Sequence, residues 1–458
     1  MRRTMVINLV GLTESMIGPN TPNLFNLKNR GDFSRIETIT PAVTCSVQAT
    51  FLTGTMPDKH GIVANGWFDR QYNEVWFWRQ SNKLIQSEKV WEAAKKLNNK
   101  FTCANMFWWY NMATSVDFAV TPRPMYPADG RKIPDCHTKP AELRHTLTEK
   151  LGPFPLFNYW GPMTSIDSSR WITEASKIVW HSKNPTLMLV YLPYLDYNLQ
   201  RHGPQSPEIS DDISLVDQLC GELIDMASND NANVIVLSEY AVTPVDKPIH
   251  INRALRQSGL LQVRYELGLD QLDLANSRAF AVSDHQISHI YVNISEDIPG
   301  VKKLIESLDG VDEVLSDEGS KQNYNLNHGR SGDLIALAKP NAWFTYYFWM
   351  NDHCAPDYAR TVDIHRKPGF DPVELFYDST IRGLPIAIAW KLFKKKLGFR
   401  QLLDVIPLNA ELIKGSHGLV HHSEQHSPVV ITSEQNQLSN VTPACDIKQL
   451  ILDHVFVS

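Results

Sequence analysis

The sequence predicts an α/β fold with a mostly parallel central sheet flanked by helices. Three continuous apolar runs, MVINLV near the N-terminus, the segment Thr186 to Leu192 and the later NVIVL, are typical of strands buried on both faces of a parallel sheet. ISLVDQLCGELIDMAS, which precedes the last run, has the three- and four-residue apolar spacing of a helix. Val10, Asp196 and Glu239 follow the three runs, and a loop is expected after Leu192. Because open α/β sheets bind ligands at the carboxyl ends of their strands, these positions mark the expected site.

Composition limits the classes of protein that this chain can represent. The chain has 458 residues, of which 43% are hydrophobic and 21% charged, an ordinary globular composition. Its net charge of -6 gives no reason to expect a nucleic-acid partner. No apolar stretch is long enough to span a bilayer, so we expect no membrane partner. Six scattered cysteines and an N-terminal apolar run too short for an export signal favour the cytoplasm.

The segment from Thr40 to Ile62 is the first candidate for chemistry. Small polar residues, including Thr44, precede VQATFLTG, which predicts a short helix that ends at Gly54 and cannot resume at Pro57. Backbone N–H groups at a helix start favour anions, so a hydroxyl there is well placed to attack phosphorus. The local pattern also fits a simple N-cap role for Thr44, and both interpretations stay open at this point.

The segments VINLVGLTESMIGPNTPNLFNL and TPAVTCSVQATFLTGTMPDKHGIVANGWFD resemble the alkaline-phosphatase superfamily. The branch is that of type I phosphodiesterases and nucleotide pyrophosphatases, and the chain is similar also to phosphonoacetate hydrolase. The resemblance continues through YLPYLDYNLQRHGP, VIVLSEY and GSHG, and so covers most of the chain. It implies metal-dependent hydrolysis of phosphodiester, phosphomonoester or phosphonate bonds in a small molecule, with Thr44 as the nucleophile. It also implies cap subdomains inserted into the core.

The resemblance further implies a set of metal-binding positions, several of which are altered here. Asp196 and His417 match the family ligands, and Glu239 replaces an aspartate. The remaining family positions hold residues that bind metal weakly or not at all, namely Gln200, Tyr240 and Val10. Since an amide oxygen suits a hard cation but is a poor zinc ligand, the usual two-zinc centre is not expected. The expected cofactor is a divalent metal, zinc or another, with as few as one ion.

Two insertions are expected to form the cap. The predicted core comprises residues 1–243 and 341–458 with an aromatic-rich insertion at 65–171, and residues 244–340 form an α+β subdomain. The first insertion supplies three candidates for contact with an anionic substrate, Asn65, Arg123 and Arg131. A solvated loop with surface charge is the alternative interpretation of the two arginines.

Other polar clusters are alternatives to the family site. Asp363, His365 and Asp371 lie in a ligand-rich segment and form an alternative metal cluster, unless the neighbouring Arg and Lys residues pair with them. In DHQISH, His285 and His289 are expected on one face of an extended segment, as structural histidines or as a further metal site. The late histidines are expected at the surface, namely His421, His422 and His426.

Three functional hypotheses follow. The first is a hydrolase of phosphorus esters that uses a threonine nucleophile and an atypical metal site. The second is a catalytically inactive relative that acts as a binding or scaffold protein. The third places an unfamiliar reaction on the cluster around Asp363 and His365.

Overall fold

The computed structural model describes residues 1–420 and 426–456. His421 and His422, expected at the surface, lie outside this part of the chain. Within it, no helix is long and apolar enough to cross a membrane. All six cysteines are free thiols.

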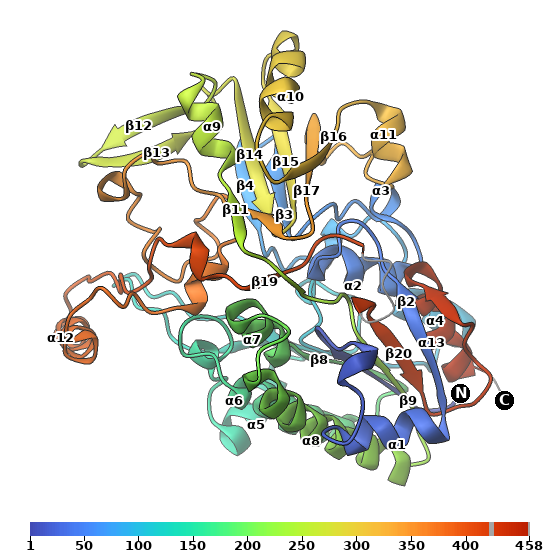
Figure 1. Ribbon diagram of the computed structural model, residues 1–458. Helices are drawn as coiled ribbons and strands as arrows, with labels where there is room; N and C mark the ends of the chain where they lie inside the picture. The colour runs from blue at the N-terminus through green and yellow to red at the C-terminus, as the bar shows by residue number, and fades with distance from the viewer. Residues whose placement is uncertain (421–425, 457–458) are drawn as a thin grey trace.

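A nine-stranded sheet forms the centre of the larger body (Figure 1). Its strands β9, β1, β8, β5 and β6 are mutually parallel, and antiparallel pairs occur only toward the two edges. The predicted α/β fold with a mostly parallel sheet is therefore confirmed. In spatial order the strands are β21 (Val441–Pro443), β2 (Asp32–Glu37), β20 (Val429–Thr432), β9 (Asn233–Leu237), β1 (Thr4–Leu9), β8 (Leu187–Leu192), β5 (Cys103–Met106), β6 (Phe118–Pro122) and β7 (Cys136–Lys139).

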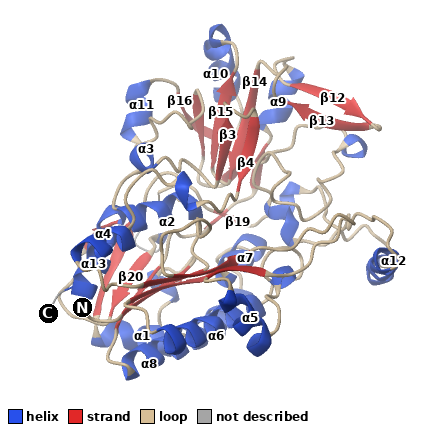
Figure 2. Cartoon of the chain, turned by 180° about the vertical axis from the view of Figure 1, so that it is seen from behind, coloured by secondary structure: helices blue, strands red, loops and turns tan. Residues whose placement is uncertain are grey.

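Helices cover both faces of this sheet, as Figure 2 shows. One layer contains α1 (Pro22–Arg30), α5 (Glu142–Leu151), α6 (Ile166–Lys183) and α8 (Glu208–Asn229). The other contains α2 (Thr44–Thr53), α4 (Val90–Leu97) and α13 (Ile447–Phe456). All six residues of β1 and all of β8 are buried, which explains their uninterrupted apolar sequence.

A second body stands above the carboxyl edge of the central sheet. Its antiparallel sheet has the order β14 (Ala279–Asp284), β15 (Ile287–Val292), β17 (Leu334–Ala338) and β16 (Val311–Leu315). The helices around it are α3 (Pro57–His60), α9 (Ile251–Gln257), α10 (Ile298–Glu306) and α11 (Glu318–Asn323). Two hairpins, β3 (Gly66–Asp69)–β4 (Glu74–Phe77) and β12 (Gln262–Glu266)–β13 (Leu269–Asp273), also lie around it. The remaining strands form the pair β11 (Lys247–Ile249)–β18 (Ala342–Phe344). The pair β10 (Thr243–Pro244)–β19 (Gly415–Ser416) lies between the bodies, and α12 (Leu384–Lys396) lies at the end of a projecting arm.

The aromatic-rich segment 65–171 contributes to both bodies. Its strands β5, β6 and β7 join the central sheet, whereas β3 packs toward the second sheet through Phe68, whose ring contacts Phe280 and Tyr291. The domain boundaries given above stay a prediction.

The segment after β8 differs from the expectation. We expected a loop there, but residues Tyr194–His202 form the helix α7. Leu195 and Leu199, four residues apart, are buried against the core, and that apolar spacing stabilises a helix. Leu199 lies so close to β1 that a Cβ at Gly11 would approach its Cδ1 atom to 2.6 Å. Gly11 follows β1 and has a φ of 80°, a left-handed conformation that favours glycine at this point.

Candidate active site at the carboxyl ends of the central strands

Thr44 is the first residue of α2, and its hydroxyl lies beside the end of the central sheet. Its Oγ1 atom is 3.0 Å from the hydroxyl of Tyr240, which follows β9. Tyr240 in turn donates to Asp196 Oδ1 at 3.4 Å. The three residues come from α2, the β9 end and α7, and only the fold brings them together. They form a hydrogen-bonded chain from the candidate nucleophile to a buried carboxyl group.

Asp196 and Gln200 share one face of α7 because they are four residues apart. The Gln200 amide donates to Asp196 Oδ2 at 2.7 Å, so its nitrogen rather than its oxygen faces the carboxyl group. Burial raises the pKa of Asp196 to about 7. This carboxyl group is therefore poised to accept or release a proton near neutral pH.

His417 completes this side of the site. Its Nδ1 atom donates to the carbonyl of Ala42 at 2.7 Å, which leaves the lone pair on Nε2. Nε2 lies 3.9 Å from Asp196 Oδ1, and the ring stacks on Tyr240 with centroids 3.6 Å apart. Burial lowers the pKa of His417 to about 3, so the imidazole is neutral. The lone pair of the neutral His417 Nε2 atom thus faces the Asp196 carboxyl group, an arrangement in which both groups can bind the same cation.

Glu239 lies on the other side of Thr44 and is satisfied differently. Its Oε1 atom accepts hydrogen bonds from the amides of Asn8 and Gln48, both at 2.5 Å. Oε2 is buried and has no hydrogen-bond partner among the described residues. Burial raises the pKa of Glu239 to about 8, so the protonated carboxyl predominates at neutral pH. The two neutral amides therefore occupy the space around the Glu239 carboxyl group in which a metal ion would have to bind.

The donor set does not fit a two-metal centre. Val10 is fully buried and apolar, the Tyr240 hydroxyl lies between Thr44 and Asp196, and Glu239 is bound by amides. Across residues 1–420 and 426–456, no three His, Cys, Asp or Glu side chains are grouped so that they could hold a metal ion. Asp196 and His417 are two suitable ligands for a single ion, whose other positions water or substrate would have to fill.

Asp284 and His285 also lie at this site, although they could not be predicted from the sequence as part of it. Asp284 is the last residue of β14, and His285 follows it in the turn to β15 with a φ of 57°. The His285 ring lies 3.7 Å from the His417 ring and 3.7 Å from the Phe370 ring, centroid to centroid. The expectation that His285 and His289 share a face is wrong because the chain reverses between them. The short gap between the two apolar runs was a hairpin signal that could have shown this.

Asn65 connects this turn to the nucleophile helix. Its side-chain amide donates to Asp284 Oδ1 at 3.1 Å, and its backbone N–H donates to Asp284 Oδ2 at 2.7 Å. Its Oδ1 atom accepts from the backbone N–H of Cys45 at 2.9 Å. Burial raises the pKa of Asp284 to about 7. Asn65 thus holds the start of α2 against the second body, one residue from Thr44.

Comparison with known proteins assigns the family. Residues 4–371 match the family described as Type I phosphodiesterase / nucleotide pyrophosphatase. The chain belongs to this family. An uncharacterized pyrophosphatase/phosphodiesterase of Schizosaccharomyces pombe is 27% identical over 235 residues. That alignment covers 49% of this chain, and the chain spans only 41% of the length of this curated relative.

Solved structures share the fold of this phosphodiesterase-family chain at low sequence identity. Human ectonucleotide pyrophosphatase/phosphodiesterase 5 has a TM-score of 0.61 and 14% identity, over 100% of this chain and 96% of that one. Phosphonoacetate hydrolase from Sinorhizobium meliloti 1021, in complex with phosphonoformate, has a TM-score of 0.62 and 15% identity, over 99% and 96%. The superfamily resemblance predicted from the sequence is therefore confirmed.

The two candidate arginines lie away from the residues that surround Thr44 in this phosphodiesterase-family site. Arg123 is exposed, and its backbone N–H donates to the carbonyl of Asp135. Arg131 is exposed and pairs with Asp129 at 2.7 Å. Neither side chain has a described contact with Thr44, Asp196 or His417.

The alternative cluster is built around an internal cation. Asp371 accepts from the buried Nζ of Lys367 at 2.5 Å, and Glu374 lies 2.7 Å from the same atom. Asp363 contacts Glu374 only through its backbone N–H, and His365 Nδ1 lies 3.3 Å from the carbonyl of Phe77. The single cation Lys367 pairs with both Asp371 and Glu374, so this cluster is arranged around an ammonium group rather than around a metal ion.

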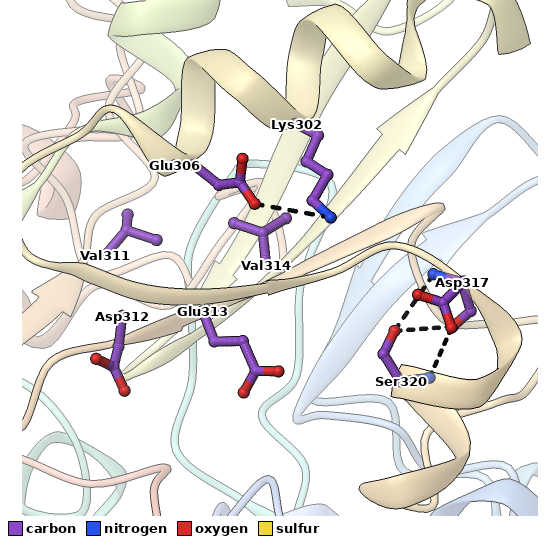
Figure 3. A pocket seen from close by; sticks show the side chains of 8 residues that line it. All are labelled: Lys302, Glu306, Val311, Asp312, Glu313, Val314, Asp317 and Ser320. Atoms are coloured by element: carbon purple, nitrogen blue, oxygen red, sulfur yellow. Dashed lines mark hydrogen bonds and ion pairs between the residues drawn. The ribbon is translucent and has the colours of Figure 1, made fainter.

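A hollow of about 380 Å³ lies far from this site, between α10 and β16 (Figure 3). Its charged lining consists of Lys302, which pairs with Glu306 at 3.7 Å, and acidic side chains. The acidic lining residues are Glu306, Asp312, Glu313 and Asp317. An excess of negative charge repels a phosphorylated or phosphonate ligand, so this hollow is a poor candidate for a substrate site.

Proposed function

We propose that this chain is a hydrolase of phosphodiester, phosphomonoester or phosphonate bonds in a small molecule, with Thr44 as the nucleophile. The observation that carries the proposal is the hydrogen-bonded chain from Thr44 through Tyr240 to Asp196 at the start of α2. The relatives support the substrate class, because proteins with this fold have been solved in complex with AMP and with phosphonoformate. The six free thiols favour a reducing cytoplasm.

The hydrogen-bonded chain supplies a route for the nucleophile's proton. As Thr44 Oγ1 forms its bond to phosphorus, its proton passes to the Tyr240 oxygen, and the Tyr240 proton passes to Asp196. The leaving group, an oxygen in an ester or a carbon in a phosphonate, departs with the electrons of its bond to phosphorus and takes a proton from water, and the phosphoryl group stays on Thr44. Water then attacks phosphorus and returns Thr44, with the proton flow reversed. The raised pKa of Asp196, about 7, suits both directions of this transfer.

A single divalent ion held by Asp196 and His417 would be the alternative to this proton route, because a carboxylate that binds a cation does not also take up the proton. The family implies such an ion, and the His417 Nε2 lone pair facing Asp196 at 3.9 Å is suited to hold it. When bound, it would neutralise negative charge on the phosphoryl oxygens. Glu239 and Val10 would take no part in holding it. His417 is kept in orientation by the Ala42 carbonyl.

A second candidate function is binding without turnover. It is favoured by the burial of the site, because Thr44 is only 4% and Asp196 only 6% exposed. The amides of Gln200, Asn8 and Gln48 already satisfy the carboxyl groups that relatives would present to metal. Such a protein would hold a phosphorylated ligand at the start of α2 without cleaving it.

Turnover assays with a matched variant separate the two functions. An aryl phosphodiester, an aryl phosphomonoester and phosphonoacetate are each offered with Mg²⁺, Mn²⁺ or Zn²⁺. Thr44→Ala should lower turnover at least about a thousand-fold, because the nucleophile is removed. Ser46→Ala is the control, since the Ser46 hydroxyl is buried on the same helix with no partner among the described residues.

Equal turnover by Thr44→Ala and the parent would remove Thr44 from the mechanism. Binding of AMP or phosphonoformate without turnover under any of these conditions would establish the second function instead. Melting temperatures of both variants verify that each remains folded.

A further inference from the structure

The helix α12 lies at the end of an arm that projects from the protein, as Figures 1 and 2 both show. None of its thirteen residues, Leu384–Lys396, is buried. Large apolar side chains are instead exposed to solvent, to 77% for Ile386, 56% for Trp390, 49% for Phe393 and 59% for Leu397. The arm lies beyond residues 4–371, which match the family, so the family match does not account for it.

These apolar side chains form one continuous face. Ile386, Trp390, Phe393 and Leu397 are spaced by four, three and four residues, which places them along one side of a helix. The Trp390 and Phe393 rings stack with centroids 5.7 Å apart. The name "outer face" is used below for these four residues. The outer face has no packing partner in the described part of the chain.

The opposite side of α12 is attached to the protein. Leu384 and Ile388 pack against the core of the second body, and Lys391 forms an ion pair with Asp404. Just beyond the helix, Arg400 donates to the carbonyl of Ala128 at 2.5 Å. The arm is therefore held in place while the outer face remains uncovered.

Charge on the arm is of one sign. The chain as a whole carries -6, yet no Asp or Glu occurs between Asp378 and Asp404. Six cations lie in that interval, namely Arg382, Lys391, Lys394, Lys395, Lys396 and Arg400. Lys394 lies over the Trp390 ring, with its Nζ atom 5.3 Å from the centroid, so cations border the outer face directly.

We propose that α12 docks this protein on the surface of an anionic lipid bilayer. A helix with Trp, Phe and aliphatic residues on one side and lysines beside them lies in the membrane interface with its apolar side inserted. Trp390 suits the boundary between headgroups and acyl chains, and the lysines suit anionic headgroups. Thirteen residues are too few to span a bilayer, so docking agrees with the lack of a spanning helix in the described residues.

The neighbouring loop extends the docking surface. Met125 and Tyr126 are exposed to 42% and 57%, and the same loop receives the Arg400 contact at Ala128. A second copy of the chain fits this surface less well, because pairing two such arms would bring twelve cations together, of which only the two copies of Lys391 are ion-paired within the described residues, with Asp404. Our expectation of no membrane partner rested only on the lack of a spanning segment, and docking at the surface does not need one.

Vesicle co-sedimentation tests the proposal on the full chain. With vesicles of phosphatidylcholine and phosphatidylglycerol at physiological salt, the parent should sediment, and 0.5 M salt should release it. The variant I386S/W390S/F393S should lose binding because the inserted side is removed. The variant K394Q/K395Q/K396Q should bind about a hundred-fold more weakly, at roughly fivefold for each lysine.

A matched variant controls for net charge. K100Q/K150Q/K303Q removes three exposed lysines elsewhere and should bind vesicles like the parent. The altered α12 side chains are not buried, so all variants should melt like the parent. The proposal is overturned if the parent does not sediment with anionic vesicles, or if the two lysine variants behave alike. It is also overturned if the parent is a dimer that I386S/W390S/F393S converts to a monomer without any lipid binding.

Discussion

Two groups of buried carboxylates in this protein are neutralised in opposite ways. Asp371 and Glu374 surround the ammonium group of Lys367, and all three side chains are almost completely buried. Asp196 and Glu239 have no Lys or Arg ion-pair partner among the described residues, and neutral groups bind them instead. The first group contains its own cation, and the second contains none.

The comparison shows which of the two groups of carboxylates can still bind a further cation. A buried carboxylate without a counter-charge must bind a proton or a cation, because desolvated negative charge is costly. The raised pKa values of Asp196 and Glu239, about 7 and about 8, are the protonated solution to that problem. A metal ion beside His417 would be the other solution for Asp196. In the cluster around Lys367 one cation already pairs with both carboxylates, although burial still raises the pKa of Asp371.

The largest expected effect comes from removing the internal cation. Lys367→Met should lower the free energy of unfolding by about 3–5 kcal/mol, because Asp371 and Glu374 would remain buried without their partner. Urea unfolding at pH 7 measures the loss. Lys96→Met, which removes an exposed pair with Glu88, is the control and should cost far less, because exposed ion pairs contribute little to stability. Equal losses in the two variants would contradict the structural role of Lys367.

A smaller effect should distinguish the two clusters as metal sites. Mn²⁺ or Zn²⁺ at about a hundred times its Kd should stabilise the folded parent by about 2.7 kcal/mol, seen as a higher melting temperature. Asp196→Asn should abolish this rise, whereas Asp371→Asn should retain it even if its own melting temperature is lower. A rise that survives in Asp196→Asn and disappears in Asp371→Asn would place the metal on the alternative cluster.

The smallest effect is a pH dependence that arises from Glu239. Its pKa is raised to about 8 in the folded state, so its stabilising contribution is complete below its ordinary pKa and is lost as pH rises toward 8. Between pH 6 and pH 7, the free energy of unfolding of the parent relative to Glu239→Gln should fall by about 1.4 kcal/mol. Urea unfolding at both pH values measures it. The exposed Glu149→Gln should parallel the parent, and a flat difference for Glu239→Gln would refute the raised pKa.

Much of the fold could be predicted from the chain because buried strands have a clear composition. The apolar runs around Ile7, Val190 and Val236 became β1, β8 and β9, adjacent strands of one sheet. The helix after Thr44 and its end at Gly54, which has a φ of 65°, also follow from local chemistry. The helix α7 was not predicted, because the polar residues around Leu195 and Leu199 give no indication that these two leucines are buried.

The parallel sheet, the superfamily and the substitutions at Val10, Gln200 and Tyr240 can all be identified from the chain alone, since they depend only on composition and local motifs. The groups that replace the missing ligands are known only from the folded structure. Asn8 and Gln48 reach Glu239 from different elements, and His285 reaches His417 from the second body. Such contacts depend on how distant segments pack, and neither periodicity nor spacing along the chain encodes which polar groups will meet in the interior.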